Sequence, residues 1–321
     1  MISAYREDKW LEANIEKEEG KYIQFEFENE CGKIVYGFIK KEAGSVDGEK
    51  YYDIASYRGA EGPYIENVKD GNVQELIKAF QKAFEKYCRS NNIVAEFAKL
   101  DPWDTYAKEL RSTLGAEYYG NYYCNDLTTD FYNDVYNRNA KRGIKKAVAG
   151  GVCAKFDFSG KTIPEFVRLY KNTEDKFNTS NYYRFDEKDI KKFFDIYGSD
   201  AFLINAVLEE KIITSVLVVM GKDVAHYLFL GSDAQFSKLQ ANCLLTYEAA
   251  MYCKSAGRKI FDMGGGIPGG GIEKFKRNFI DENGVWEYYA IKKIHNWEVY
   301  DELVNKVDEI RNLKFFPLYR G

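Results

Sequence analysis

The sequence has few of the residues on which metal sites, catalytic triads and disulfide frameworks depend. Only two histidines occur among 321 residues, His226 and His295, and they stand far apart. A histidine-rich metal site or a Ser-His-Asp triad therefore has little to draw on, and we expect no metal site. The six cysteines are scattered and include no C-x-x-C pair, which is typical of a protein in a reducing compartment.

Long apolar runs and an excess of positive charge are also missing. No stretch approaches the run of about 18 apolar residues that indicates a membrane-spanning helix, and the first 20 residues lack the apolar core of a signal peptide. We therefore expect a cytoplasmic protein with no integral membrane segment. The formal net charge of −4 excludes a surface that is basic throughout, so any site for anions must be a local patch.

Apolar residues are nevertheless plentiful, at 45% of the chain with 30% charged. This balance is typical of a globular protein with a sizeable core. A chain of 321 residues is also long enough for two domains of roughly 100–200 residues each.

The same order of predicted elements occurs twice. Residues 22–125 read as two alternating strands joined by a tight turn, a third strand, a long amphipathic helix, a strand, a short helix and a last strand. The order returns in residues 201–294, with Glu96 and Asp262 in similar places. Predicted helices connect the two modules, and an amphipathic helix at 297–312 follows them. Such a repeat indicates a duplicated module, although hairpin–helix–strand orders also recur by chance.

Several motifs stand out along the chain: KRGIKKAVAGGV (141–152), LFLGSDAQF (228–236) with a following N-x-L-L, FDMGGG (261–266), FKRNF (275–279) and, in the first module, DIASYRGAEGPY (53–64). They resemble motifs of the FemAB-like family. Proteins of that family are tandem GNAT-fold transferases, and the Fem-type members attach amino acids to peptidoglycan precursors. The resemblance implies an α+β fold of two tandem GNAT-like modules, each a mixed sheet flanked by helices, with a closing C-terminal helix. We assign 1–125 plus 298–321 to the first module, and 126–297 to the second module with the transfer site.

The resemblance implies an acyl or aminoacyl transferase that forms an amide on an amine of a peptidoglycan-type cell-envelope precursor. No side chain is a convincing nucleophile, so we expect direct transfer without a covalent enzyme intermediate. Acetyl-CoA enzymes of this fold bind the pyrophosphate with a glycine-rich loop, but residues 234–240 contain no glycine. Aminoacyl-tRNA is therefore the expected donor substrate, with no resident cofactor.

Two alternatives stay open. The long coiled-coil arm of some Fem proteins is absent from residues 157–198. That absence favours an acyl-CoA-dependent N-acyltransferase that modifies an amino sugar of a surface polysaccharide. A duplicated GNAT module could also serve as a non-catalytic binding protein.

The glycine-rich segment 264–271 matches neither common nucleotide-binding loop. No second strand with an acidic end follows at about 20 residues, and no Lys-Ser/Thr pair follows the glycines. We expect Gly264 and Gly265 to wall a substrate channel, because glycine lets the backbone approach a ligand closely. The alternative is a turn whose glycines only satisfy backbone geometry.

Lys276 and Asp262 are the predicted catalytic residues. By resemblance, the lysine of the F-K-x-x-F motif lies at the transfer site, where its charge can stabilise an oxyanion or a donor phosphate. Asp262, at a strand end, is a candidate general base, as is Glu96. A solvated lysine and a buried carboxylate paired with a lysine are the alternatives. Phe275 is expected to contact substrate, although its i,i+4 spacing to Phe279 also suits the core.

Positive charge gathers on one helix. Five basic residues spaced 3, 1, 3 and 1 fall on one face, with no acidic residue on the helix to pair with them: Arg138, Lys141, Arg142, Lys145 and Lys146. We expect this face to bind phosphates of a nucleotide- or lipid-linked precursor, or of tRNA, unless it is only solvated. Tyr227 and its neighbour His226 lie on the third strand, where alternation turns one to the core and the other to the substrate gap.

Overall fold

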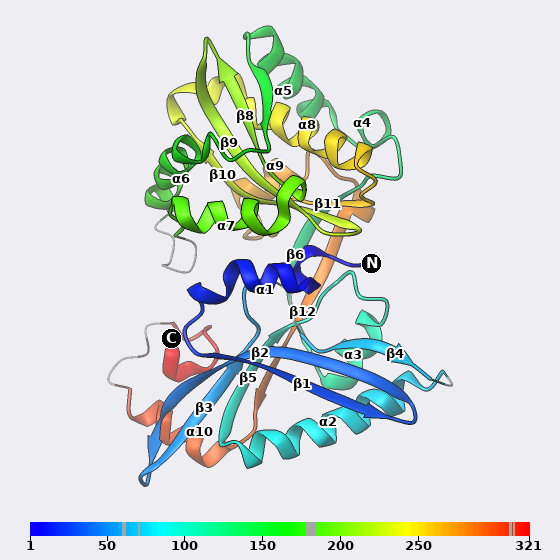
Figure 1. The fold of residues 1–321 in the computed structure, drawn as a ribbon, viewed down its shortest axis with the longest axis vertical. Coiled ribbons are helices and arrows are strands. Elements are labelled where there is room, and N and C mark those ends of the chain that lie inside the picture. The colour runs from blue at the N-terminus through cyan, green and yellow to red at the C-terminus, as the bar shows by residue number, and fades with distance from the viewer. Residues whose placement is uncertain (60–61, 70, 178–183, 308–309, 311) are drawn as a thin grey trace. The chain divides into compact units, whose positions relative to one another are not determined.

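The computed structural model describes residues 1–321 except 60–61, 70, 178–183, 308–309 and 311 (Figure 1). The chain forms two compact units. The first unit comprises Ile15–Tyr119 and Glu287–Gly321, and the second comprises Met1–Asn14 and Gly120–Trp286. The functional modules that we assigned from the sequence stay a prediction.

The first unit contains a mixed sheet in which one pair of strands is parallel. The strand order is β1 (Lys21–Asn29), β2 (Gly32–Val46), β3 (Glu49–Ala55), β5 (Ile93–Lys99) and β12 (Val285–Ile294), with β4 (Tyr64–Val68) also paired to β2. Strands β3 and β5 are parallel and the other pairs are antiparallel. The helices of this unit are α2 (Val73–Ser90), α3 (Ala107–Leu114) and α10 (Trp297–Asn305).

The second unit repeats this arrangement. Its strand order is β6 (Glu117–Asp126), β11 (Ile260–Asp262), β10 (Val224–Ser232), β9 (Lys211–Met220), β8 (Ala201–Leu208) and β7 (Cys153–Asp157). Strands β10 and β11 are parallel, and the other pairs are antiparallel. Its helices are α1 (Asp8–Asn14), α4 (Phe131–Asp134), α5 (Arg138–Ala149), α6 (Ile163–Phe177), α7 (Glu187–Tyr197), α8 (Ala241–Ser255) and α9 (Gly271–Lys276).

The α+β class and the duplicated order of elements are confirmed. In each unit a hairpin leads to a third strand, a long helix and a strand parallel to the third. Three elements were not predicted: β4, β7 and α1. The closing helix α10 ends at Asn305, whereas the sequence pattern extended it to 312; residues 308–309 and 311 of that stretch lie outside the described residues.

Each unit has its own apolar core beneath its long helix. Helix α2 is amphipathic, and its buried face, which includes Phe80 and Phe84, packs on the first sheet. Helix α8 is more deeply enclosed, because β8–β10 lie under it and α5 lies beside it. Gly143 permits the close contact of α5 with α8, since a Cβ there would lie 2.6 Å from Cys243 Sγ. Helix α5 therefore covers one side of the start of α8.

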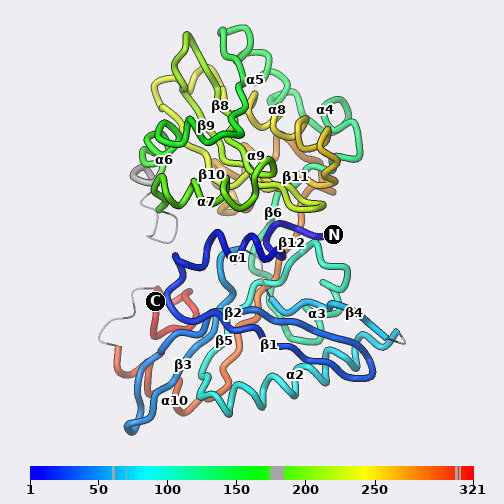
Figure 2. The backbone as a smooth tube through the Cα atoms, viewed as in Figure 1, coloured from blue at the N-terminus to red at the C-terminus, as the bar shows by residue number. Residues whose placement is uncertain are grey.

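The N-terminal segment belongs to the second unit, although it precedes the first unit in sequence (Figure 2). Ser3 forms an isolated bridge with Val224 at the start of β10. Trp10 is buried against Phe193 of α7, and the Tyr5 ring stacks on His226. Residues this distant in sequence meet only in the folded chain. The sequence pattern of the N-terminal segment alone therefore did not predict α1.

Three further features concern the sequence-based expectations. Within the described ranges, no helix combines the length and apolar character needed to cross a membrane. The same residues include no group of three or more His, Cys, Asp or Glu side chains placed to hold a metal ion. None of the six cysteines forms a disulfide bond.

Candidate active site

The parallel strands β10 and β11 separate at one residue pair. They are in register at only three positions, and the last pair is His226 with Asp262. Beyond this pair β10 continues to Ser232, with a register shift between Tyr227 and Phe229, while β11 ends. Strand β11 is only three residues long, and it cannot extend through Gly264, which adopts φ +74°, a value that an extended strand does not allow.

The glycine segment folds back over the end of β11. The Gly264 N–H donates to Asp262 Oδ1 at 2.6 Å, and the Gly264 carbonyl accepts from the Tyr123 N–H on β6. The next carbonyl, that of Gly265, accepts a hydrogen bond from the Lys276 ammonium. Gly264, Gly265, Asp262 and Lys276, which the sequence analysis selected separately, therefore lie in one cluster.

Lys276 is a half-buried cation in this cluster. Its Nζ lies 2.5 Å from the Gly265 carbonyl oxygen. Burial lowers the pKa of Lys276 to about 8, against the opposing effect of the negative charge on Asp262. A desolvated ammonium group held in place by a main-chain carbonyl is suited to stabilise negative charge that develops nearby.

Asp262 is almost fully enclosed and is engaged by three groups. Its exposed fraction is 1%. Besides the Gly264 N–H, it accepts a hydrogen bond from His226 Nδ1 at 2.9 Å and lies 3.7 Å from Cys124 Sγ. This geometry indicates that Asp262 holds the end of β11 in place and favours the protonated form of Lys276.

Tyr227 lies on the opposite face of β10 from His226. Its ring packs edge-on against Phe261 at 5.9 Å, and its hydroxyl lies 3.5 Å from Thr246 Oγ1 on α8. Burial raises the pKa of Tyr227 well above its usual range. The alternation that the sequence left open is thereby resolved: Tyr227 faces α8, whereas His226 faces Asp262.

Phe275 packs against the apolar core from the end of α9. It is half-buried, and its ring lies 5.0 Å from that of the fully buried Phe279. It precedes Lys276 in the sequence, but its ring packs against the apolar core, and its i,i+4 partner anchors the helix.

Glu273 is a site residue that the sequence analysis missed. It is 7% exposed, accepts a hydrogen bond from the Gly269 N–H and pairs with Arg277 Nε at 2.7 Å. It thus fastens the far end of the glycine segment to α9. An acidic residue in the first turn of a short helix that follows glycines was the available signal.

The basic face on α5 is largely solvent-exposed. Lys141 is half-buried, and its Nζ donates to the Asn133 carbonyl at 2.9 Å. The other four side chains are exposed and form no ion pair with any residue that the structure describes: Arg138, Arg142, Lys145 and Lys146. The opposite side of the helix is buried, so these cations are held on a rigid support.

Two asparagines join α5 to the end of α9. Asn137 caps α5 by accepting from the Asn139 and Ala140 N–H groups. Its own N–H donates to the Asn278 carbonyl, and its side-chain amide donates to Asn278 Oδ1, both at 3.0 Å. The helix that carries the basic face is therefore tied to a residue two positions after Lys276.

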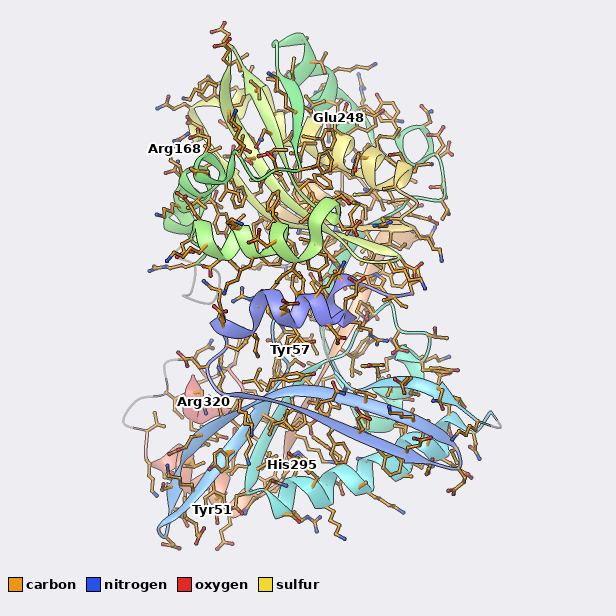
Figure 3. The ribbon with its side chains drawn as sticks, in the orientation of Figure 1. Tyr51, Tyr57, Arg168, Glu248, His295 and Arg320 are labelled. Carbon is orange, nitrogen blue, oxygen red and sulfur yellow. The ribbon has the colours of Figure 1, made fainter. Side chains whose placement is uncertain are left out.

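Glu96 and Asp262 do not occupy equivalent places, contrary to the expectation from the repeat. Each lies on the strand parallel to the third strand of its unit, but Glu96 faces the long helix, near Tyr36. It pairs there at 3.0 Å with His295, which is labelled in Figure 3. Asp262 faces away from α8, because its neighbours Phe261 and Met263 fill the core under that helix. Glu96 therefore belongs to the first unit's interior.

Comparison with known proteins places this site in a recognised domain. Residues 136–277 match the family described as acetyltransferase (GNAT) domain, and this range contains every predicted site residue except the candidate base Glu96. The crystal structure of FemX superposes with a TM-score of 0.66 at 13% identity, covering 92% of each chain. The chain has a FemAB-like tandem GNAT fold. It is an enzyme of the acyltransferase class.

Other solved structures share this FemAB-like fold. L-PGS from Bacillus licheniformis has a TM-score of 0.52 at 13% identity, with 93% of this chain and 94% of that chain covered. The C-terminal domain of a putative lysylphosphatidylglycerol synthetase from Agrobacterium fabrum has a TM-score of 0.53 at 13% identity, with coverage of 86% and 85%. No curated protein sequence matches the chain. At these identities the comparisons establish the fold, and the substrates have to be argued from the site.

Proposed function

We propose that the protein transfers an aminoacyl or acyl group to an amine of a peptidoglycan-type cell-envelope precursor, in the cytoplasm, and forms an amide. The observation that carries the proposal is the Lys276 ammonium, held on the Gly265 carbonyl beside the point where β10 and β11 separate. The ordered motifs shared with Fem-type transferases support the same reaction class.

The proposed chemistry is direct attack of the acceptor amine on the acyl carbonyl carbon. The tetrahedral intermediate carries an oxyanion, and Lys276 supplies a preorganised positive charge for it. The intermediate then collapses to the amide: the bond to the donor oxygen or sulfur breaks, the nitrogen loses a proton, and the tRNA hydroxyl or the CoA thiol leaves. The removal of one such group typically lowers the rate by about 10²–10³-fold. Asp262, buried beside Lys276, favours the charged form of the lysine.

Direct transfer fits the chemistry of the nearby thiols. Cys243 and Cys253 are buried on α8. Burial raises the pKa of Cys243 to about 11 and that of Cys253 even further. Because the thiolate is the nucleophile, such cysteines are inert at neutral pH.

Aminoacyl-tRNA is the proposed donor. The segment before α8 is a glycine-free 3-10 helix, Ala234–Leu239, rather than a loop of glycines that exposes N–H groups to a pyrophosphate. Helix α5 also covers one side of the start of α8 through Gly143. An acyl-CoA donor with an amino-sugar acceptor remains the second candidate, favoured by the lack of a coiled-coil arm.

The exposed cations of α5 are proposed to hold phosphates of the acceptor or of the tRNA. Four basic side chains on one face, none of them in an ion pair with a described residue, provide a site at which several phosphates can bind. The link from Asn137 to Asn278 would keep these phosphates at a fixed distance from Lys276.

The direct test is a transfer assay that crosses donors with acceptors. The purified protein is incubated with charged tRNA or acyl-CoA, and with UDP-linked and lipid-linked peptidoglycan precursors, and amide products are detected by mass spectrometry. Product from charged tRNA is expected. Transfer from acyl-CoA only would replace our proposal with the second candidate, and binding without turnover by any pair would favour a non-catalytic protein.

A further inference from the structure

The N-terminal segment, residues 1–14, is fastened to the second unit at the start of β10. The Ile2 N–H donates to Asp223 Oδ2 at 2.8 Å, and the Asp223 N–H donates to the Ile2 carbonyl at 2.9 Å. Gly221 lets the segment pack closely on the turn before β10, since a Cβ there would lie 2.3 Å from the Ala4 nitrogen. These contacts fix the segment in place beside the strand that carries His226.

Tyr5 is the residue of this segment that contacts the strand end. Its side chain is 7% exposed, and its ring stacks on the His226 imidazole with 4.0 Å between ring centres and 25° between the two planes. The buried Trp10 packs edge-on against Tyr5 at 4.7 Å. A ring that lies flat on an imidazole resists its rotation, because rotation would destroy the stacked contact.

The orientation of His226 affects a chain of contacts that ends at Lys276. His226 Nδ1 lies 2.9 Å from Asp262 Oδ2, and Asp262 Oδ1 accepts the Gly264 N–H at 2.6 Å. The carboxylate is thus held at both oxygens, which fixes the start of the glycine segment. The next residue, Gly265, offers its carbonyl to the Lys276 ammonium.

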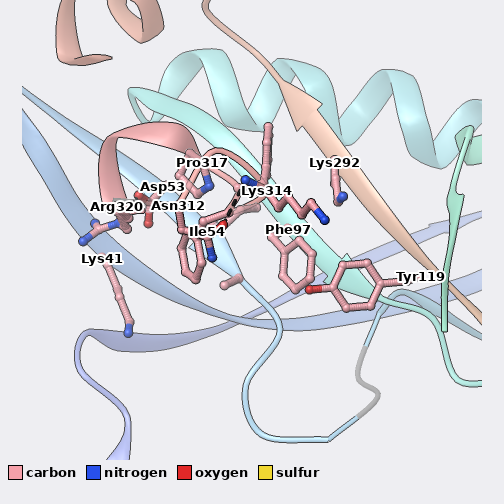
Figure 4. Close-up of a pocket in the computed structure, with 13 residues that line it drawn as sticks. Lys41, Asp53, Ile54, Phe97, Tyr119, Lys292, Asn312, Lys314, Pro317 and Arg320 are labelled. Atoms are coloured by element: carbon pink, nitrogen blue, oxygen red, sulfur yellow. Dashed lines mark hydrogen bonds and ion pairs between the residues drawn. The ribbon is translucent and has the colours of Figure 1, made fainter. Parts of the chain in front are cut away.

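A buried carboxylate of the first unit is held in a different way. Asp53 on β3 is bound by Arg320 Nε at 2.5 Å (Figure 4). A guanidinium has five N–H donors and a permanent charge, so it can hold a carboxylate in more than one orientation. An imidazole reaches the carboxylate with Nδ1 in one ring orientation only. The carboxylate of Asp262 therefore needs a neighbour that fixes the ring of His226.

We propose that Tyr5 is a positioning residue for Lys276 and acts through His226 and Asp262. Loss of the stacked ring lets the imidazole turn, releases one carboxylate oxygen and loosens the turn that holds the ammonium. A displacement of about 1 Å at a reacting group can lower the rate on the order of 10²-fold. The proposal rests on the transfer reaction proposed above, and it makes the N-terminal segment a part of that site.

Tyr5→Leu is the first test, because leucine fills space but cannot stack. We expect kcat to fall by roughly 10–100-fold, with the KM for the acceptor within about twofold of normal, since the basic face of α5 is unchanged. Tyr5→Phe keeps the ring and should retain near-normal kcat. Gly221→Ala should reproduce the loss of kcat, because its Cβ displaces the segment at Ala4 while Tyr5 itself is intact.

Tyr170→Leu is the matched control. Tyr170 on α6 is 6% exposed and stacks on Phe166, so its removal costs the second unit a comparable buried ring. We expect kcat of this variant, measured below its unfolding transition, to be unchanged. A loss of kcat equal to that of Tyr5→Leu would show that general destabilisation is the cause and would overturn the proposal.

Two further readouts need no transfer reaction. The Gly264 amide should exchange its hydrogen at least tenfold faster in Tyr5→Leu, measured by mass spectrometry of peptides that contain this residue, and should be unaffected in Tyr5→Phe. The chain has only two histidines, so ¹⁵N-labelled histidine gives two sets of imidazole signals. In Tyr5→Leu the signals of His226 should shift, while those of His295 serve as the internal reference.

The outcomes separate this proposal from the proposed function. Normal kcat and normal Gly264 exchange in folded Tyr5→Leu would overturn the positioning role, and if that variant does not fold, the same result in Gly221→Ala would do so. A loss in Tyr5→Phe as large as in Tyr5→Leu would disprove the stacking role. Faster Gly264 exchange in a protein whose unmodified form transfers no group would refute the transfer reaction but confirm the contact chain from Tyr5.

Discussion

His226 Nδ1 lies 2.9 Å from Asp262 Oδ2, and both side chains are buried to within 1%. The two residues form the last in-register pair of β10 and β11, and the Tyr5 ring stacks on the histidine with ring centres 4.0 Å apart. A buried polar pair is therefore the last contact between β10 and β11 before the two strands separate. Three segments distant in sequence meet at this pair.

We predict that His226→Phe destabilises the second unit. Phenylalanine keeps a flat ring for Tyr5 but leaves Asp262 with one partner fewer, and a buried group deprived of its partner typically costs about 1–3 kcal/mol. Urea unfolding measures the loss. In a double-mutant cycle with Asp262→Asn, the two effects should be non-additive, and fully additive effects would show that the pair is not coupled.

His295→Phe is the matched control for this substitution. His295 forms a comparable buried pair with Glu96 in the first unit. We expect a similar loss of stability, but kcat measured well below the unfolding transition should be unchanged. Only the second unit's pair adjoins the proposed transfer site.

Lys276→Ala is expected to lower kcat by about 10²–10³-fold while the melting temperature stays within a degree or two. Burial disfavours the charged form of Lys276, so we expect its removal to leave the free energy of unfolding almost unchanged. Lys274→Ala, which removes an exposed lysine from the same helix, should leave kcat unchanged. Near-normal kcat in Lys276→Ala, or global unfolding, would remove the catalytic role.

The pH dependence of kcat should show an alkaline limb near pH 8. Burial lowers the pKa of Lys276 to about 8, so the ammonium form predominates below that pH and is lost above it. Lys276→Arg should move the limb beyond the accessible range, because guanidinium stays protonated. The measurement is the ratio of kcat for the unmodified protein to kcat for Lys276→Arg across pH 6.5–10. Titration of the acceptor amine affects both enzymes equally and therefore cancels in this ratio. A ratio independent of pH would argue against the oxyanion role of Lys276.

Arg142→Ala is expected to raise the KM for the acceptor roughly tenfold with little change in kcat. The reason is that the lost charged contact would be made equally in the ground state and in the transition state. The side chain is exposed on α5 and unpaired within the described part of the chain. The effect should shrink at high salt. Lys188→Ala on α7 is a control of equal charge, and an equal effect in that variant would mean that only net charge matters.

Gly264→Ala should reduce both stability and kcat. The residue has φ +74°, which costs a side-chain-bearing residue about 1–2 kcal/mol, and relaxation of the backbone would shift the Lys276 contact. Gly269→Ala is the matched control, because its φ is +77° and a Cβ there would meet nothing within 4 Å. We expect similar destabilisation from both variants, with a large loss of kcat in Gly264→Ala only.

Local patterns in the sequence determined much of the fold. The helical period of α2, with Leu76, Phe80 and Phe84 on its buried face, and the alternation of the β1–β2 hairpin are properties of short segments. For this reason the elements and their repeated order could be predicted. The clusters of glycines and of basic residues could be identified as candidate site residues for the same reason, because the backbone freedom of glycine and the charge of lysine and arginine are properties of the residues themselves.

Tertiary structure decided what these residues do together. The face on which Glu96 and Asp262 lie depends on which side of each sheet the long helix packs, and strand order in the sequence does not specify this. The contact of Tyr5 with His226, the link from Asn137 to Asn278 and the role of Glu273 all join positions through space. The pKa of Lys276 likewise follows from burial and the neighbouring Asp262 charge, which exist only once the chain has folded around them.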